Sequence, residues 1–492
     1  MNEYFEQGIT LVFVAIYLAV MGYHAWLGKQ KVHSLSDYLV AGRNLGGWVV
    51  ALSFYATFMS TNTFIGAAGK SWDAGLIWCV GIVVYVGLCG MAWYLVAPRF
   101  VPLTRQYGSL TIADFLGYRY QSLALRRFSA AIIVFASVIY LVAIYKGSAL
   151  ALEGMLGFSY PVALIMIFIL VTAYTLAGGF QSVILTDAVQ GILMVLGAVG
   201  IAMTLLLRGG GLFAMLETVK SQDAGLVSWS GKMSWLNVIG LSLAVGIKYV
   251  VEPRQLSRFY GLKNRKALKQ AALIAPLLVC VTYVALLPVG VLSHALIPEN
   301  AIQSSDEVIP YLLSESQIFG PVLSSLFLLV LLSAAMSSID SVLLVAGSAM
   351  DHDLIAPNRV ELESGGVSGV RFWVVVISMV SVLVALSPFA QDIMSMTSLS
   401  GALYGACFLP ALVVGLFLPK LSVRASLSSC ITGLFSVVGW HMAKRFEWTS
   451  IHEVYVGLFV GMFVFLLVTA IDGWQDGRRG KEKVADNREV QL

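Results

Sequence analysis

The chain has 492 residues, of which 58% are hydrophobic and 12% are charged, and its formal net charge is +4. A soluble globular domain usually contains about 25% charged residues. The composition therefore excludes a soluble protein and indicates an all-α polytopic membrane protein. Basic loops beside membrane helices account for a small positive charge, so the charge gives no indication of nucleic-acid binding.

Thirteen apolar runs are long enough to cross a membrane, for which about 20 residues are needed. They lie near residues 8–27, 46–69, 76–97, 128–151, 159–178, 184–207, 235–253, 268–294, 319–350, 372–388, 396–418, 425–443 and 454–472. The first run lacks the basic start and cleavage site of a signal peptide, so we expect it to remain as a helix. We therefore predict about 13 transmembrane helices.

The lysines and arginines fall mostly in alternate loops, which predicts the N-terminus outside and the C-terminus inside. The loop from Arg254 to Lys269 is expected to be one of the basic inner loops. The five cysteines lie in apolar runs without a C-x-x-C pair, so we expect core residues rather than disulfides or metal ligands. The six histidines are scattered, and no metalloprotease, nucleophile-elbow or phosphate-loop motif appears in a suitable setting, which argues against a membrane enzyme.

The second apolar run is interrupted by polar residues at mid-depth. Ser60, Thr61, Asn62 and Thr63 are successive polar and partly β-branched residues, which are poor helix formers. Broken helices supply ion-coordinating carbonyls in secondary transporters, where protein or a water-filled cavity surrounds the irregular backbone. The run predicts such a break, and a continuous helix with a Ser/Thr packing face is the alternative.

Two lysines lie inside apolar runs, namely Lys146 and Lys248. A lysine near the end of a span commonly extends its ammonium group to the interface. The alternative is that one of them pairs with a substrate carboxylate or with an intramembrane acid such as Asp340. Gly240 and Gly246 lie in the segment of Lys248 and are compatible with a second broken helix.

The pair Gly178–Gly179 predicts a turn before the sixth span, which carries Asp187 and Gln190. Asp187 lies about two turns from the expected inner end of the span, too deep for its short side chain to reach water easily. We expect it to face a polar interior or a cation. Burial as a protonated carboxyl group is the alternative.

Residues 333–341 form a polar stripe in the ninth span. Ala334, Ser337 and Ser338 stand at i, i+3 and i+4, so they share one helix face. This face offers hydroxyl and carbonyl oxygens without a formal charge, which suits a weakly held monovalent cation. Asp340 is by default a functional-site candidate. The alternative is that these serines bond to their own helix or hold helices together.

The order of four motifs resembles the sodium:solute symporter family, which includes sodium/proline, sodium/pantothenate and sodium/glucose cotransporters. The motifs are the segments 36–43, 64–66, 178–190, and 334–338 followed by 351–354. The resemblance implies a leucine-transporter-like 5+5 inverted repeat. Mapped onto this chain, it gives an N-terminal extra helix and basic cytoplasmic loop (1–45), a first repeat of spans 2–6 (46–207), a second repeat of spans 7–11 (234–420), two C-terminal helices (421–473) and a basic cytoplasmic tail (474–492).

The resemblance also implies a sodium site between the broken first core helix and the eighth core helix. By motif, its ligands correspond to the carbonyls of Ala56, Met59 and Ala334 and the hydroxyls of Ser337 and Ser338. This agrees with the shared face found from spacing alone.

Some family members hold a second sodium ion, using the aspartate that corresponds to Asp187 and three serines of the ninth span. The first of these serines is Ala334 here, which favours one sodium ion over two. Asp340 is a candidate for the missing group, either in a second sodium site or in coupling.

Substrate contacts in relatives come partly from the broken helix beyond the sodium ligands, which implies Thr61, Asn62, Thr63 and Phe64. The glutamine that sugar-transporting relatives use is Thr63 here, and the third span contains no acidic residue, so the resemblance argues against a sugar. Lys248 gives a preference for a carboxylate-bearing solute, such as an amino acid, a monocarboxylate or a pantothenate-like acid.

The implied function is import of a small organic solute with Na⁺ by alternating access across the plasma membrane. The expected partners are the solute and the lipid bilayer, and not a nucleic acid. The alternative is a transporter-like solute sensor without net transport, although such a sensor normally carries an output domain. The solute, the choice between one and two sodium ions, and the oligomeric state stay open.

Overall fold

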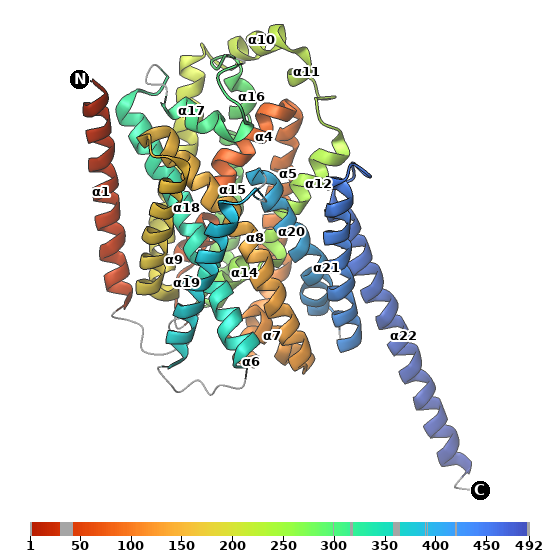
Figure 1. Ribbon diagram of the computed structural model, residues 1–492. Coiled ribbons are helices and arrows are strands. Elements are labelled where there is room, and N and C mark those ends of the chain that lie inside the picture. Colours follow the sequence, from red (N-terminus) through yellow and green to blue (C-terminus); the bar gives the residue numbers. More distant parts are fainter. Residues whose placement is uncertain are drawn as a thin grey trace.

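The computed structural model describes residues 2–29, 43–298, 300–314, 318–357, 365–388, 390, 392–418 and 421–489, and within them the chain folds into helices without a β-strand. Most helices run in a similar direction through one bundle, and α10 and α11 cross its end near the N-terminus (Figure 1). Of the predicted motif at 36–43, only Arg43 lies among the described residues.

The helices of the first half follow the predicted apolar runs closely. They are α1 (Asn2–Lys29), α3 (Gly47–Phe58), η2 (Asn62–Gly66), α4 (Ala67–Ala74), η3 (Leu76–Val80), α5 (Gly81–Met91), η4 (Ala92–Val96), α6 (Ala97–Tyr107), α7 (Ile112–Tyr120), α8 (Leu123–Leu156), α9 (Tyr160–Arg208), α10 (Leu212–Gln222) and α11 (Ala224–Val227).

The second half again consists of long apolar helices joined by short turns. Its elements are α12 (Trp235–Gly246), α13 (Lys248–Val251), α14 (Pro253–Tyr260), α15 (Arg265–Leu286), α16 (Val289–Ser293), η5 (Ser305–Glu307), α17 (Val308–Ser314), α18 (Gly320–Ser348), η6 (Ala349–Ile355), α19 (Gly365–Ala385), α20 (Ile393–Phe408), η7 (Leu409–Val413), η8 (Val414–Leu416), α21 (Val423–Arg445) and α22 (Glu453–Glu489).

Ten helices in the described residues are long and apolar enough to cross a membrane, and the bent pair Gly47–Phe58 and Asn62–Ala74 makes an eleventh. The other two predicted runs coincide with the shorter apolar helices Thr10–Tyr23 and Tyr160–Leu176. The polytopic helical architecture is therefore confirmed. The count of thirteen spans and the orientation of the termini stay predictions.

The pair Gly178–Gly179 does not interrupt the helical backbone, since α9 continues through it. The helix nevertheless bends sharply. The evidence is a hydrogen bond of 2.6 Å from the Tyr174 hydroxyl to the Thr186 hydroxyl. Twelve residues of a straight helix would separate these positions by about 18 Å. The predicted change of direction is therefore present as a bend within the helix, as is typical of adjacent glycines.

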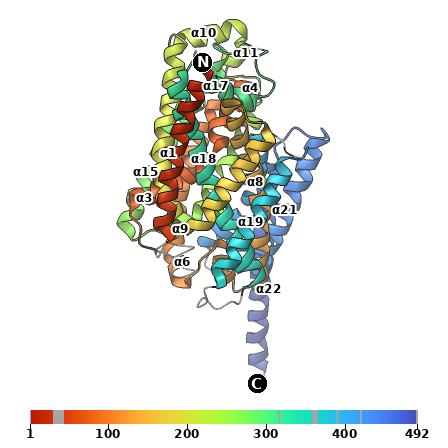
Figure 2. The same ribbon diagram turned by 60° about the vertical axis from the view of Figure 1, so that its left-hand side comes forward.

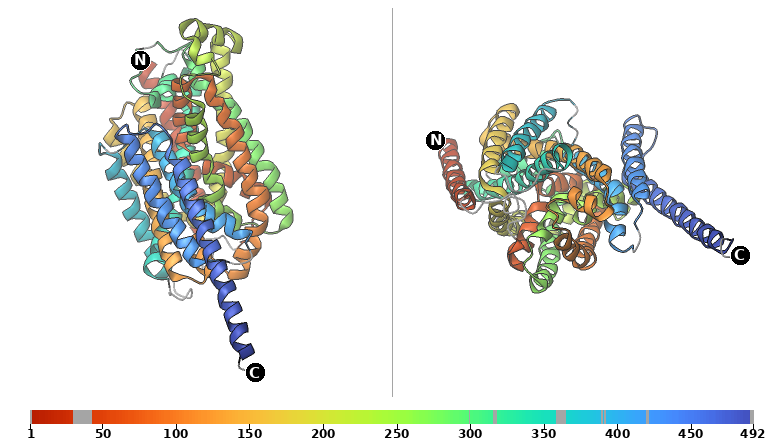
Figure 3. Two further views of the ribbon diagram at one scale, coloured as in Figure 1. Left: turned by 90° about the vertical axis from the view of Figure 1, so that its right-hand side faces the viewer. Right: turned by 90° about the horizontal axis from the view of Figure 1, so that it is seen from below.

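The most buried spans lie in the middle of the bundle. The most apolar parts of α18 and of the span Ile393–Leu416 are each 83% buried, against 22% for α22. The end-on view in Figure 3 places α1 and α22 at opposite edges, and Figure 2 shows α22 projecting beyond the bundle. The helices with polar stripes are thus the ones that the protein itself surrounds.

The segment predicted as a basic loop from Arg254 to Lys269 begins instead inside the bundle, so that prediction is wrong for its first part. Arg254 and Arg258 are 2% and 0% exposed on α14, which continues the seventh span as far as Tyr260. Pro253 starts this short helix, where its missing N–H group costs nothing. The prediction from charge alone put these arginines in solvent. In the structure, buried polar partners hold them inside the helix bundle.

Candidate functional site

The first broken helix lies at the predicted polar run. Helix α3 ends at Phe58, Met59 adopts an extended conformation, and the two halves of the span meet at 59°. Ser60 caps the second half, because its Oγ accepts from the backbone N–H of Asn62 (3.2 Å) and its carbonyl accepts from that of Thr63 (2.9 Å). The break releases carbonyls at the end of α3 from the helical hydrogen-bond pattern.

Two serines of α18 contact these carbonyls. The hydroxyl of Ser337 donates to the Ala56 carbonyl (3.1 Å) and lies 3.4 Å from the Ala334 carbonyl, while that of Ser338 donates to the Thr57 carbonyl (3.2 Å). All five residues are buried. The structure therefore brings together four of the predicted sodium ligands, and it adds the carbonyl of Thr57, which the sequence analysis did not include.

The spacing of these oxygens suits a hard cation. Oxygens at about 2.4 Å from one ion in an octahedral shell lie about 3.4 Å from each other. The separations of 3.1 to 3.4 Å around Ser337 are close to this value. Met59, the remaining predicted ligand, lies at the break itself, one residue beyond the end of α3.

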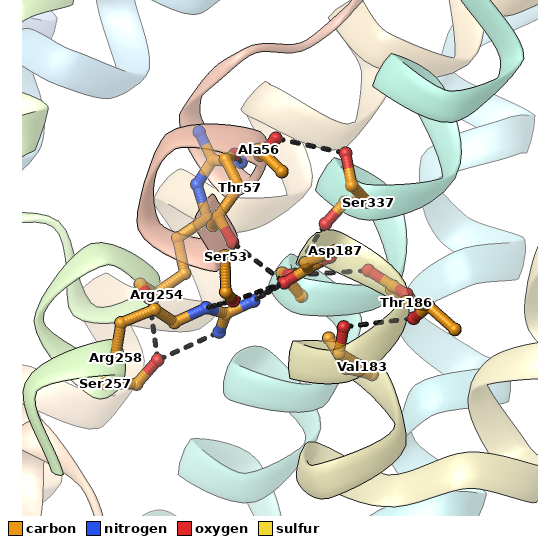
Figure 4. Close-up of polar contacts among 12 residues, drawn as sticks. Ser53, Ala56, Thr57, Val183, Thr186, Asp187, Arg254, Ser257, Arg258 and Ser337 are labelled. Carbon is orange, nitrogen blue, oxygen red and sulfur yellow. Dashed lines mark hydrogen bonds and ion pairs between the residues drawn. The ribbon is translucent and has the colours of Figure 1, made fainter. Parts of the chain in front are cut away.

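Asp187 lies beneath this group of oxygens and forms an ion pair with Arg258. Its Oδ2 accepts hydrogen bonds from Arg258 Nη2 (2.8 Å), Ser53 Oγ (2.7 Å) and Thr57 Oγ1 (3.2 Å), as Figure 4 shows. Asp187 and Arg258 are 0% exposed. Buried charges are tolerated when they are paired and hydrogen-bonded. Asp187 therefore faces two polar hydroxyl groups and the guanidinium group of Arg258.

The second acid, Asp340, lies close to the same guanidinium group. Arg258 Nη2 donates to Ser341 Oγ (2.5 Å), and Ser341 Oγ lies 3.2 Å from Asp340 Oδ1. Asp340 Oδ2 has no hydrogen-bond partner among the described residues. Arg258 thus connects Asp187 of α9 with the polar stripe of α18.

The span Trp235–Tyr260 consists of α12, α13 and α14 and is interrupted at Glu252, whose backbone is extended; we call this span the second broken helix. Charged side chains surround the interruption. The Lys248 ammonium group lies 3.2 Å from the centre of the Tyr140 ring and 3.8 Å from Glu252 Oε1. Glu252 Oε1 also accepts a hydrogen bond from Arg254 Nε at 2.7 Å. Lys248 is 1% exposed, and its Nζ donates no hydrogen bond within the described part of the chain.

The two broken helices are in direct contact. Arg254 Nη1 donates to the Thr57 carbonyl over 2.6 Å, so this carbonyl accepts from both Arg254 and Ser338. The Tyr140 hydroxyl donates to Ser60 Oγ (2.9 Å), which places the aromatic face under Lys248 next to the first break. Displacement of either helix therefore disturbs hydrogen bonds of the other.

The predicted substrate residues all lie in the interior. Thr61, Asn62, Thr63 and Phe64 are between 0% and 3% exposed. Asn62 Oδ1 has no hydrogen-bond partner in the described structure, whereas Thr61 Oγ1 donates to a carbonyl of α8 (3.4 Å). The close approach of α8 is possible because position 147 is a glycine, where a Cβ atom would lie 2.8 Å from Thr61 Oγ1.

Lys146 has a different partner from Lys248. Its ammonium group forms an ion pair with Asp306 Oδ2 at 3.4 Å. Burial raises the pKa of Asp306, and Lys146 opposes this rise. Lys146 is therefore paired with Asp306, whereas Lys248 lies beside Glu252.

Four residues of this site were not predicted from the sequence, namely Arg254, Arg258, Glu252 and Tyr140. The two arginines stand four residues apart and share a face of α14, which was a usable signal. They were instead counted as loop cations because they follow an apolar run.

The chain is similar to known transporters over most of its length. The model of the sodium:solute symporter family matches residues 38–433. The sodium/pantothenate symporter of Haemophilus influenzae is 27% identical over 94% of this chain and 96% of its own length. The osmoregulated proline transporter OpuE of Bacillus subtilis is 28% identical over 94% of each chain, and the sodium/proline symporter of Staphylococcus aureus is 26% identical over 94% of this chain and 92% of its own.

Solved structures show the same fold. A Na⁺-coupled sialic acid symporter in a substrate-bound outward-open state has a TM-score of 0.79 at 19% identity, over 93% of this chain and 96% of its own. Mhp1, a nucleobase-cation-symport-1 transporter, has a TM-score of 0.56 at 14% identity, over 89% of this chain and 95% of its own.

The family and the matched relatives are transporters rather than enzymes. Na⁺ is accordingly the co-transported ion, and the chain is a multi-pass protein of the plasma membrane. The resemblance found from four motifs is confirmed over most of the sequence: this chain belongs to the sodium:solute symporter family.

Proposed function

We propose that this protein imports a carboxylate-bearing solute together with one Na⁺ per transport cycle. The observation that carries the proposal is the meeting of the Ser337 and Ser338 hydroxyls with the Ala56 and Thr57 carbonyls. These uncharged oxygens come from two helices, so a cation bound among them favours one relative position of α3 and α18. A ligand shifts a conformational equilibrium only through such differential contacts.

In the proposed Na⁺ site, the carbonyls of Ala56, Met59 and Ala334 and the hydroxyls of Ser337 and Ser338 are the ligands. A hydroxyl group has acceptor lone pairs as well as one donor, so each serine is able to coordinate the ion and keep a hydrogen bond. The Thr57 carbonyl accepts hydrogen bonds from both Ser338 and Arg254. A shift of Ser338 when Na⁺ binds would therefore change the contact of α3 with the second broken helix.

The count of one Na⁺ rests on Arg258. This guanidinium group already supplies a positive charge to Asp187, at 2.8 Å. A second cation beside Asp187 would have to overcome repulsion from Arg258 in a buried setting, where charges interact strongly. We therefore assign Asp187 and Asp340 to coupling through Arg258 rather than to a second sodium site.

A carboxylate-bearing solute fits both the relatives and the geometry. Proline, pantothenate and sialic acid, which the relatives carry, all bear a carboxylate group. Lys248 provides a buried ammonium group beside the ring of Tyr140; it lies 3.8 Å from Glu252 Oε1 and donates no hydrogen bond to the residues that the structure describes. The second half of the first broken helix begins next to this ring, and the start of a helix attracts anions. Residues 61–64 are the proposed solute contacts.

The proposed cycle is alternating access, with the N-terminus outside and two inverted repeats at 46–207 and 234–420. One charge that crosses 100 mV supplies about 2.3 kcal/mol. A tenfold Na⁺ gradient adds about 1.4 kcal/mol. For a zwitterionic solute such as an amino acid, these two terms together support accumulation by a factor of roughly a few hundred per Na⁺. A monoanion imported with one Na⁺ moves no net charge, so the Na⁺ gradient alone supports about tenfold accumulation.

The test is uptake into proteoliposomes with an inward Na⁺ gradient, using labelled proline, pantothenate, lactate and glucose, with choline in place of Na⁺ as control. We expect Na⁺-dependent uptake of one of the acids and none of glucose. Uptake of glucose alone, or the same uptake in choline, would contradict the proposal.

A pair of matched variants separates the Na⁺ site from general damage to α18. Ser337→Ala removes a proposed ligand and should raise the Na⁺ concentration for half-maximal uptake by about tenfold, since a lost interaction of this kind costs about 1.4 kcal/mol. Ser348→Ala is the control, because this buried serine of α18 donates to a carbonyl of its own helix. Equal Na⁺ dependence of the two variants would remove Ser337 from the site.

A further inference from the structure

A large groove lies between the segment from η4 to α6 and the beginning of α15. Its volume is about 900 Å³. The lining residues are Trp93, Tyr94, Pro98, Val101, Pro102, Arg105, Asn264, Arg265, Leu268, Lys269 and Ala272. None of them belongs to the broken helices or to the proposed Na⁺ site, so the transport mechanism leaves the groove unexplained.

The groove is polar at one end and continues into an apolar face. Arg265, Lys269, Leu273 and Leu277 follow one another at intervals of four residues, so they form one stripe along α15. The two leucines are 68% and 59% exposed, and Tyr94 across the groove is 58% exposed. On a membrane-spanning helix, exposed leucines of this kind face hydrocarbon, so the cations lie where the acyl region gives way to headgroups.

The charged end of the groove is uniformly basic. Arg105, Arg265 and Lys269 line it, and no acidic residue does so among the described residues. Arg105 Nη2 donates to the carbonyls of Leu262 and Lys263. Arg265 and Lys269 have no acidic partner in the described part of the chain. The start of α15, capped by Asn264, adds partial positive charge.

We propose that this groove is a binding site for a phospholipid with an anionic headgroup. Its phosphate would lie against Arg265 and Lys269, and one acyl chain would follow the leucine stripe. Basic pockets between membrane helices recognise anionic headgroups in this way. Because Arg105 bonds to the segment that joins α14 to α15, the lipid would bind next to the Tyr260 end of the second broken helix.

The test is native mass spectrometry of the full-length purified protein titrated with phosphatidylglycerol or phosphatidylcholine in mixed micelles. We expect one phosphatidylglycerol to be retained in preference to phosphatidylcholine. Each basic residue near an anionic headgroup contributes a factor of about five. The double variant Arg265→Gln/Lys269→Gln should therefore weaken retention by about 25-fold.

The matched control is Lys263→Gln/Lys266→Gln, which removes the same charge from neighbouring positions that do not line the groove. Equal weakening by both double variants would overturn the site, because it would indicate general surface charge. Equal retention of the two lipids by the unmodified protein would also overturn it, independently of any variant. Displacement of phosphatidylglycerol by millimolar glycerol phosphate would indicate a soluble phosphate ligand and would refute the lipid.

Discussion

The ion pair between Asp187 and Arg258 provides the sharpest test of how the polar interior is organised. Replacing Arg258 with Met leaves the carboxylate of Asp187 buried with only the Ser53 and Thr57 hydroxyls as donors. Loss of one partner from a buried pair costs about 3–5 kcal/mol, because the remaining charge is uncompensated. We expect Asp187→Asn to destabilise the protein in the same range.

The double variant Asp187→Asn/Arg258→Met should recover most of this loss, since it leaves no isolated charge. A residual cost of about 1 kcal/mol is expected from the hydrogen bonds that Ser53 and Ser341 lose. The double variant should thus be more stable than either single variant by about 2–4 kcal/mol. Arg424→Met is the control, because the ion pair of Arg424 with Asp472 is exposed and contributes little.

The assay is thermal unfolding of the purified protein in detergent, once in Na⁺ and once in choline. The unfolding temperature should be highest for the unmodified protein and Arg424→Met, lower for the double variant, and lowest for the two single variants. Stabilisation by Na⁺ should persist in the double variant, because the proposed Na⁺ ligands are intact. Additive losses without recovery would refute the pairing, and selective loss of the Na⁺ effect would show that Asp187 binds Na⁺.

Three further outcomes follow from the same contacts. Lys248→Met should raise the half-saturating concentration of the transported acid at least tenfold and leave the Na⁺ dependence of uptake unchanged. An unchanged half-saturating concentration would show that Lys248 does not bind the solute carboxylate. Gly147→Ala should slow Na⁺-dependent uptake strongly, because the new Cβ would lie 2.8–2.9 Å from Thr61 atoms; full activity would show that α8 moves aside at little cost. Burial lowers the pKa of His452 to about 4, although Glu453 opposes this shift. The unfolded chain therefore binds the proton more tightly than the folded protein does. The free energy of unfolding consequently falls as the pH decreases from about 6.5 to 4. His452→Asn should remove up to roughly 3 kcal/mol of this acid sensitivity, measured by unfolding as a function of pH.

Buried contacts also join the two broken helices. The Thr57 carbonyl accepts from Ser338 of α18 and from Arg254 of α14, and the backbone of Leu45 is paired with Gly261 and Lys263 beyond α14. The segments before α3 and after α14 are therefore fixed to each other. A cation that changes the position of Ser338 relative to α3 acts on both breaks, which is the physical requirement for coupling ion binding to solute binding.

Local chemistry was sufficient to predict several features from sequence. Long apolar runs must form helices in a membrane, because lipid offers no partners for backbone groups. Polar, β-branched residues at 60–63 are poor helix formers, so the break was predictable. Helical spacing alone predicted that Ser337 and Ser338 share one face. In the structure, both hydroxyls donate to carbonyls at the end of α3. The family followed from the order of motifs.

Tertiary structure decided which charges face each other. Arg258 and Asp187 are 71 residues apart, and Arg254 and Thr57 are 197 apart, so no local pattern indicated either contact. The rule that places basic residues in loops assigned both arginines to the surface. Each is nevertheless buried, because Arg254 donates to the Thr57 carbonyl of α3 and Arg258 pairs with the Asp187 carboxylate of α9. Hydrophobicity and helix propensity depend on neighbours along the chain, whereas the cost of a buried charge depends on partners in space. The sequence by itself therefore determined the helices and the break, and only packing determined the counter-charges around them.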